Sequence, residues 1–113
     1  MITIRKVKES DLQAVAAIAK NNFATVMAKD HSANVIEKFI QHQTEDSYRS
    51  QMQWKDIYVA VLNNELVGTG ALANFGNDDT PRYSVSNCYV KTTLHNQGIG
   101  RKILEVLSSF RPL

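Results

Sequence analysis

Hydrophobic and polar residues alternate with a period of two in several parts of the chain, which predicts β-strands. Ile2–Val7 alternates in this way and reads as a half-buried strand. Tyr83–Val90 is rich in β-branched and aromatic residues, which favour strands. Two further apolar runs, 57–62 and 65–72, flank Asn63-Asn64, a pair that tolerates the left-handed backbone of a tight turn. We therefore expect a hairpin there and about four strands in all.

A helical period of 3.6 residues occurs between these strands. Ser10 and Gln13 have the spacing of a capping box and predict the start of a helix. Its expected buried side consists of Leu12, Val15, Ala16, Ile18, Ala19 and Phe23. A second stripe follows, formed by Val35, Ile36, Phe39 and Ile40. Tyr48 and Met52 extend that helix or belong to a further one, with a kink or break in the polar interval 41–46.

The stretch 83–110 combines a strand, a polar loop with two glycines and a helix. The expected buried stripe of the helix is Ile103, Leu104, Val106, Leu107 and Phe110, and Pro112 is expected to close it. Gly98 and Gly100 let a backbone approach a ligand closely. A loop of this kind that runs into a helix presents unpaired N–H groups and the positive end of the helix dipole. Arg101 and Lys102 add positive charge. The pattern predicts a pyrophosphate site, and a tight connection without a ligand is the alternative.

Two common nucleotide-binding loops fit this stretch poorly. A dinucleotide fingerprint requires a third glycine where Ile103 stands. A P-loop requires Lys-Ser or Lys-Thr where Arg101-Lys102 stands. The phosphate carrier is therefore expected to be neither a nicotinamide dinucleotide nor a P-loop nucleotide.

Val90–Leu104 resembles the acyl-coenzyme A binding motif of the GNAT superfamily of N-acetyltransferases, Arg/Gln-x-x-Gly-x-Gly/Ala after a strand. Gly98 and Gly100 match the pattern, and His95 stands at the Arg/Gln position. The first strand and helix are also similar to the family, because Ile4-Arg5 precedes a Ser-Asp-Leu cap.

The resemblance implies an α+β fold with a mixed, mostly antiparallel sheet and helices packed on it. It implies acetyl-coenzyme A as cosubstrate and direct transfer of the acetyl group to an amine of a small molecule or peptide. In the family, loop amides hold the pyrophosphate and the strand backbone pairs with the pantetheine arm. The binding residues implied here are Cys88, Val90, His95, Gln97, Gly98, Ile99, Gly100 and Arg101.

No residue is assigned to the general base or acid. The strand 83–90 contains no Asp or Glu, although its amides near Cys88–Val90 are placed to polarise a carbonyl. Cys88 is expected to be a small core residue rather than a nucleophile. The other candidates are expected to be surface or packing residues: Glu65, Asp78, Asp79, His31, His42, Tyr83 and Tyr89.

Composition limits the remaining classes. The net charge of +2, without a Lys/Arg cluster, argues against nucleic acid. No apolar run approaches the ~20 residues of a membrane span. A single cysteine excludes an intrachain disulfide and fits a cytoplasmic location, and no metal-ligand spacing is present.

The family fold continues beyond the pyrophosphate helix, so the resemblance predicts a single, C-terminally incomplete domain over 1–113. The strand 83–90 would then have an open edge, and exposed edges pair with other chains. We expect a homodimer that completes the sheet, or else a truncated or degenerate acetyltransferase. Two alternatives to the enzyme stay open: a non-catalytic acyl-coenzyme A binding module, and a small interaction domain with a phosphate-binding loop.

Overall fold

The computed structural model describes residues 1–111, and Pro112, expected to close the last helix, lies outside them with Leu113. The elements are, in chain order, β1 (Ile2–Lys6), α1 (Leu12–Thr25), α2 (Ala33–Gln41), α3 (Glu45–Gln51), β2 (Lys55–Leu62), β3 (Glu65–Asn74), β4 (Tyr83–Val90) and α4 (Ile99–Ser108). Short 3-10 turns cover Glu9–Asp11, Met27–Lys29 and Thr92–Leu94. The predicted α+β class is confirmed.

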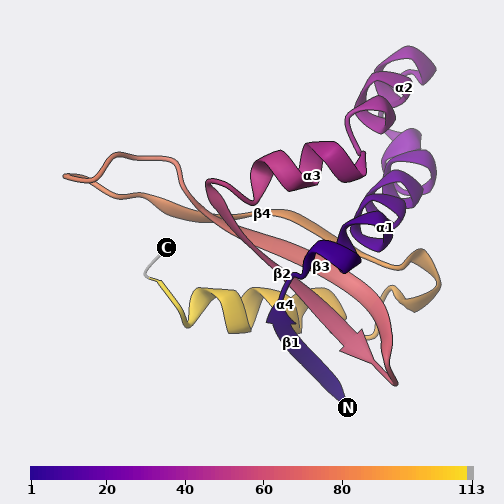
Figure 1. Ribbon diagram of the computed structural model, residues 1–113. Coiled ribbons are helices and arrows are strands. Elements are labelled where there is room, and N and C mark those ends of the chain that lie inside the picture. The colour runs from indigo at the N-terminus through magenta and orange to yellow at the C-terminus, as the bar shows by residue number, and fades with distance from the viewer. Residues whose placement is uncertain (112–113) are drawn as a thin grey trace.

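The four strands form one sheet in the order β1-β2-β3-β4. Each strand is antiparallel to its neighbour within residues 1–111. Helices α1 and α3 cover one face of the sheet and α4 covers the other, as Figure 1 shows. In the described part of the chain, β4 pairs only with β3, so its other side is an open edge.

The predicted hairpin is confirmed. Leu62 and Glu65 form the last pair of β2 and β3, and the two asparagines between them have φ values of 52° (Asn63) and 65° (Asn64). Two successive left-handed residues give the turn a twist that matches the strands it joins.

The hydrogen bonds at the start of α1 differ from those that the sequence predicted. Neither Ser10 nor Gln13 caps α1, and the side chain of Asp11, which stands directly before the helix, makes no cap bond to it. The Asp11 carboxylate accepts the Lys8 N–H (2.7 Å) across the preceding 3-10 turn and pairs with both terminal nitrogens of Arg5 (2.7 and 3.1 Å). The predicted capping box is wrong because Ser10 lies inside the 3-10 turn Glu9–Asp11 and not at the start of α1.

The polar interval 41–46 is a break between two helices. Ser32 caps α2 by accepting the Val35 N–H (3.4 Å). Thr44 caps α3 by accepting the Ser47 N–H (3.0 Å). A residue of the Ser/Thr type at each start satisfies one N–H that the helix itself leaves unpaired.

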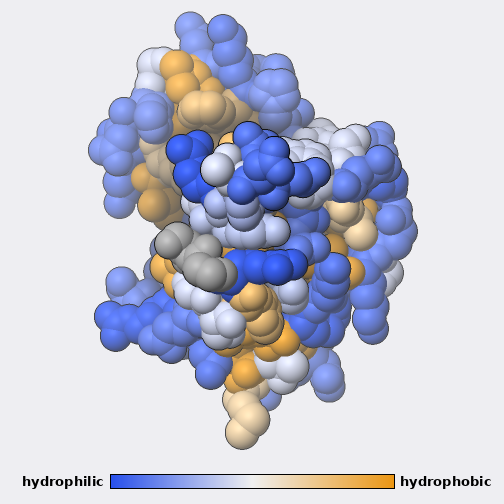
Figure 2. All heavy atoms as spheres, turned by 90° about the vertical axis from the view of Figure 1, so that its left-hand side faces the viewer, coloured by the Kyte–Doolittle hydropathy of each residue, from blue (hydrophilic) through white to orange (hydrophobic). Residues whose placement is uncertain are grey.

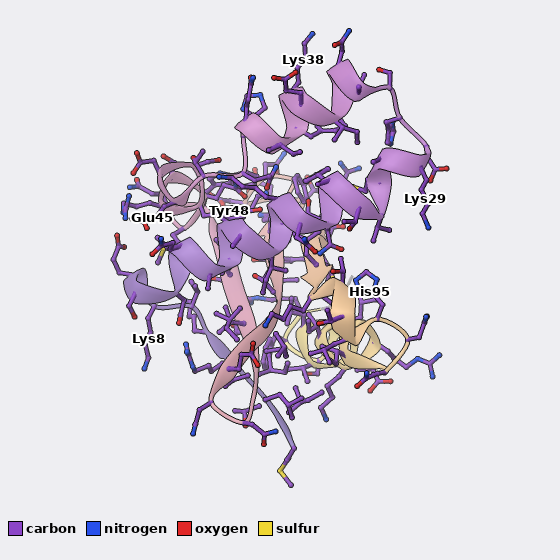
Figure 3. The ribbon with its side chains drawn as sticks, turned by 90° about the vertical axis from the view of Figure 1, so that its right-hand side faces the viewer. Lys8, Lys29, Lys38, Glu45, Tyr48 and His95 are labelled. Atoms are coloured by element: carbon purple, nitrogen blue, oxygen red, sulfur yellow. The ribbon has the colours of Figure 1, made fainter. Side chains whose placement is uncertain are left out.

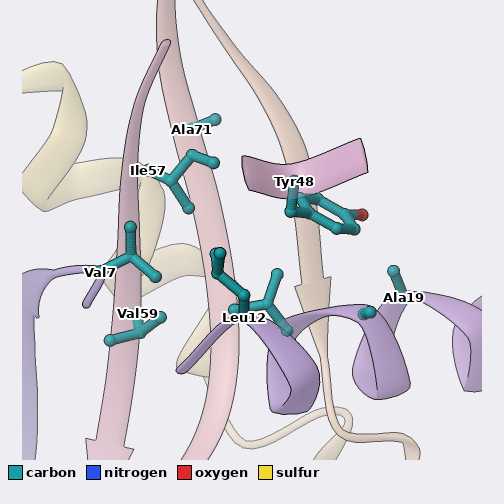
Figure 4. Close-up of a cluster of buried hydrophobic side chains, with 9 residues drawn as sticks. Val7, Leu12, Ala19, Tyr48, Ile57, Val59 and Ala71 are labelled. Carbon is teal, nitrogen blue, oxygen red and sulfur yellow. The ribbon is translucent and has the colours of Figure 1, made fainter. Parts of the chain in front are cut away.

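The core on the α1 side joins that helix and α3 to the sheet. Figure 4 shows part of this cluster. Its buried members are Val7, Leu12, Val15, Ala16, Ala19, Tyr48, Ile57, Val59 and Ala71. The hydroxyl of Tyr48 donates to Gln43 Oε1, so the one polar atom of the largest side chain in this cluster is satisfied.

The core on the other face forms beneath α4. Ile99, Ile103 and Leu107 of the helix pack on Ala60, Val67 and Leu72 of the sheet. Leu104 and Phe110 were predicted to share this buried stripe, but they are 46% and 49% exposed. That part of the prediction is wrong because the helix buries a narrower stripe, with members four residues apart.

The face of the molecule drawn in Figure 2 is mostly polar. Figure 2 views the side that carries the far end of the β3–β4 hairpin and the C-terminal end of α4, where blue hydrophilic residues surround smaller orange patches. None of the helices between residues 1 and 111 has the length and apolar composition needed to cross a membrane.

Close packing of α4 on β3 depends on two glycines, which gives a first testable prediction. A Cβ at Gly70 would lie 2.7 Å from Ile103 Cγ2, and one at Gly68 would lie 3.0 Å from Ile103 Cδ1. We expect Gly70→Ala to lower the free energy of unfolding by ~1–3 kcal/mol, because overpacking forces buried neighbours to move. Urea unfolding measures this, with Gly100→Ala as control, since the nearest atom there is 3.7 Å away. Equal stability of Gly70→Ala and the unmodified protein would contradict the contact.

Candidate active site

The loop after β4 turns the chain into α4 through two residues with positive φ. Asn96 has φ 66°, and Gly98, which stands directly before the helix, has φ 79°. Glycine adopts this conformation without a steric penalty, and asparagine is one of the few other residues that tolerate it. The loop therefore places the first turn of α4 beside the end of β4.

The N–H groups at this helix start are free of protein partners. Within residues 1–111, the amides of Gly98, Ile99, Gly100 and Arg101 donate to no protein acceptor, and the first bond of the helical type runs from the Lys102 N–H to the Gly98 carbonyl (3.0 Å). Unpaired amides at a helix N-terminus carry a partial positive charge. The exposed side chains of Arg101 and Lys102 add two full charges nearby. Such an arrangement favours the binding of an anion.

A pocket of about 460 Å³ lies between the end of β4 and the start of α4. Its lining consists of Val90, Leu94, His95, Asn96, Gly98, Ile99, Gly100 and Arg101. Six of the eight residues predicted from the family resemblance are thus together in one cavity. Their contacts with coenzyme A stay a prediction.

The other two predicted residues are not part of this lining. Gln97 lines an adjacent pocket, which shares Gly98 and Ile99 with the first one. Cys88 packs against the apolar cluster beneath α4. Burial raises the pKa of the Cys88 thiol, which keeps it protonated at neutral pH and fits the expectation of a core residue.

The peptide groups of Val90 face the open edge of β4. The next residue, Lys91, donates its N–H to the Val67 carbonyl of β3 (2.8 Å). Neighbouring residues of an antiparallel strand point their backbone groups to opposite sides, so those of Val90 point away from β3. Its carbonyl already accepts a hydrogen bond from Asn22 Nδ2 (2.8 Å) and lies 2.9 Å from His95 Nε2. Only its N–H is left for a ligand on this edge.

His95 has a structural contact that the sequence did not predict. Its ring lines the pocket, but Nε2 is directed at the Val90 carbonyl, and Figure 3 shows the side chain beside the end of β4. A carbonyl only accepts, so Nε2 carries the proton in this contact. The histidine thereby ties the loop to the strand.

Asn22 is a residue of the site that the sequence reasoning missed. It is 5% exposed, and its side-chain amide donates to Ile18 O within α1 (3.0 Å) as well as to Val90 O on β4. The run Lys20-Asn21-Asn22 reads as a polar helix face. The available signal was its spacing, because position 22 follows Ile18 by four residues and therefore lies on the buried side of the helix.

The candidates for acid–base chemistry lie outside this pocket. Glu65 pairs with Lys91, and Asp78, Asp79, His31 and His42 are exposed. Tyr83 and Tyr89 are half-buried, and burial raises the pKa of Tyr89. The packing expected for Tyr89 is present, since its ring lies 5.6 Å from that of Phe23.

The contact of Asn22 with β4 gives a second testable prediction. We expect Asn22→Ala to lower the free energy of unfolding by ~1–3 kcal/mol, because it removes a buried side chain and one of the two donors to the Val90 carbonyl. Urea unfolding measures the change. Asn21→Ala is the matched control, since Asn21 is exposed and its Oδ1 accepts only from Thr92 Oγ1 (2.6 Å). If both variants unfold at the same urea concentration, Asn22 does not fasten α1 to β4.

Comparison with known proteins places this fold and loop in context. A model of the family described as "Acetyltransferase (GNAT) family" matches residues 26–110. PaiA N-acetyltransferase from Thermoplasma acidophilum, solved in complex with coenzyme A, is similar with a TM-score of 0.80 and 21% identity, over 97% of this chain and 71% of that one. A GNAT family acetyltransferase from Brucella melitensis, solved with acetyl-CoA, has a TM-score of 0.71 and 19% identity, over 98% and 69% of the two chains.

Among curated proteins no sequence matches. The structural likenesses, at about one-fifth identity, show a shared fold. The family model spans most of the chain and includes the strand, the glycine loop and the helix that form the pocket. The chain belongs to the GNAT family of acetyltransferases.

Proposed function

We propose that this protein is an acetyl-coenzyme A-dependent N-acetyltransferase that transfers the acetyl group directly to an amine of a small molecule or peptide. One observation carries the proposal: the unpaired N–H groups of residues 98–101 surround a pocket at the end of β4. Membership of an acetyltransferase family supports the reaction class. Two similar structures contain coenzyme A or acetyl-CoA, which supports the cosubstrate.

The diphosphate of the cosubstrate fits the start of α4. Four unpaired amides lie there at the positive end of the helix dipole, and phosphate oxygens are the acceptors that such a site binds best. Gly98 and Gly100 leave the backbone uncovered, and a Cβ at Gly98 would have no atom within 4 Å. Arg101 and Lys102 supply charge to the phosphates.

The pantetheine arm follows the open edge of β4 in this proposal. Val90 offers its N–H to an amide carbonyl of the arm, whereas its own carbonyl is occupied by Asn22 and His95. In this proposal the Val90 backbone therefore only donates a hydrogen bond to the pantetheine arm and accepts none from it.

The reaction forms a C–N bond to the acetyl carbon and breaks its C–S bond. The attacking amine loses a proton, and the leaving sulfur of coenzyme A gains one. Main-chain N–H groups of β4 stabilise the negative charge that develops on the carbonyl oxygen. The thiol of Cys88 is half-buried and its pKa is raised, which argues against an acetyl-cysteine intermediate and for direct transfer.

A non-catalytic binding module is the second candidate. Of residues 1–111, those that line the pocket include no carboxylate, although a base is required for the amine. Metal-independence, a cytoplasmic location and a homodimer stay predictions. If the cosubstrate occupies the β4 edge near Val90, only the Tyr83–Ser86 half of that edge is available to a second copy.

Thiol release separates the enzyme from the binding module, which gives a third prediction. We expect the protein, incubated with acetyl-CoA and a panel of primary amines, to release coenzyme A thiol faster than without an amine. A thiol-reactive dye measures the rate. Binding of coenzyme A by calorimetry together with no amine-dependent release would favour the non-catalytic module.

The phosphate site itself gives a fourth prediction. A side chain at Gly100 begins 3.7 Å from Val90 Cγ2, so it enters the pocket rather than the core. We expect Gly100→Val to weaken coenzyme A binding by at least about tenfold, equal to a loss of ~1.4 kcal/mol. Gly98→Val should abolish binding, but its positive φ also strains the helix start, so its folding must be checked.

Calorimetry with coenzyme A measures both affinities. Leu104→Ala is the control, because Leu104 is an exposed residue of α4 outside the pocket lining, and it should bind like the unmodified protein. If Gly100→Val binds coenzyme A as tightly as the unmodified protein, coenzyme A does not bind in this pocket.

A further inference from the structure

Strand β4 contains a bulge three residues before its end. Thr69 pairs with Tyr89 and Ala71 pairs with Ser86, so Asn87 and Cys88 together oppose the single residue Gly70. Asn87 has a φ of 52°, which is left-handed backbone in the middle of a strand. A bulge breaks the regular ladder and redirects the peptide groups of the extra residue.

A lysine from another strand holds the side chain of this left-handed residue. Lys55, the first residue of β2, donates from Nζ to Asn87 Oδ1 (2.9 Å) and to Gln51 Oε1 at the end of α3 (3.2 Å). Its ammonium also lies 4.7 Å from the centre of the Trp54 ring. The ammonium of Lys55 is partly withdrawn from water, and this burial lowers its pKa. Its few protein partners therefore contribute more to stabilising its charge.

The bulge lies where the reactive end of the cosubstrate would be. Val90 directs its N–H to the open edge next to the pocket, and Asn87 is three positions back along the same strand, or ~10 Å at strand spacing. An arm that leaves the phosphate site and follows this edge therefore reaches the bulge.

Burial around the bulge also favours a fixed orientation. Asn87 is half-buried, and the hydrogen bond to its Oδ1 comes from Lys55 on β2. This contact helps to hold a backbone conformation that costs energy for most residues.

We propose that Lys55 and Asn87 are positioning residues, which hold the β4 bulge so that its N–H groups point at the thioester carbonyl of acetyl-CoA. The inference rests on the proposed function and assigns part of its carbonyl-binding geometry to these two side chains. Neither residue bonds to the acetyl group through its own side chain.

The test compares the affinities for acetyl-CoA and for coenzyme A, because only the former has the carbonyl. Calorimetry on the unmodified protein, Lys55→Met, Asn87→Gly and Asn87→Ala gives the ratio of the two. A hydrogen bond contributes ~1 kcal/mol, or about fivefold, so the unmodified protein should prefer acetyl-CoA by about that factor. Lys55→Met should lose most of the preference and keep the affinity for coenzyme A.

The two Asn87 variants separate backbone from side-chain effects. Glycine adopts a positive φ freely and alanine does not, so Asn87→Gly should retain more of the preference than Asn87→Ala. If Asn87→Ala does not fold, the affinity ratios of Lys55→Met and Asn87→Gly still test the inference. Lys6→Met is the control: Lys6 is an exposed residue of β1, the edge strand farthest from β4, pairs with Asp56 (3.3 Å), and should leave the ratio unchanged.

Two results would overturn the inference. One is an unmodified protein that binds coenzyme A but does not prefer acetyl-CoA, and the other is a Lys55→Met variant with the full preference. Absence of any coenzyme A binding to the unmodified protein is a different result, which overturns the proposed function and this inference with it.

Discussion

The close contact between α4 and β3 is the constraint on which the rest of the structure depends. Gly68 and Gly70 let the helix approach the sheet until Ile103 is in contact with the backbone of β3. This close approach fixes the distance of α4 from the sheet and the direction of its axis. It thereby places the start of the helix beside the end of β4. The unpaired amides there are a consequence of helix geometry, since the first N–H groups of any helix lack partners. Their position next to a strand edge is a consequence of the two glycines.

The two faces of the sheet then have separate roles. Helix α4 on one face presents the anion site, while α1 on the other face reaches across to the same strand end through Asn22. The Val90 carbonyl is the meeting point, because it binds Asn22 from α1 and His95 from the loop. A strand end that is held from both sides leaves its remaining N–H in a fixed orientation. In the proposed function, a donor that is already in place lowers the cost of binding the pantetheine arm.

Local signals predicted most of the fold, and long-range pairings explain what was missed. Asn63-Asn64 predicted the hairpin and the glycine loop predicted the pocket, because in each case the determining residues are adjacent in sequence. The box at Ser10 failed because a 3-10 turn that includes Ser10 precedes α1, which spacing alone does not show. Asn22 and the Lys55–Asn87 pair were missed because their partners lie 68 and 32 residues away. Leu104 was misplaced because periodicity gives a stripe but not its width.

The central claim is that the main-chain amides at the start of α4 bind a diphosphate. Its most direct test is a titration of isotopically labelled protein with coenzyme A, followed by the amide nitrogen and proton shifts of each residue in NMR spectra. The account predicts that the largest shifts occur at residues 98–101, where the amides have no protein partner. Shifts confined to other parts of the chain, or none at saturating coenzyme A, would contradict it.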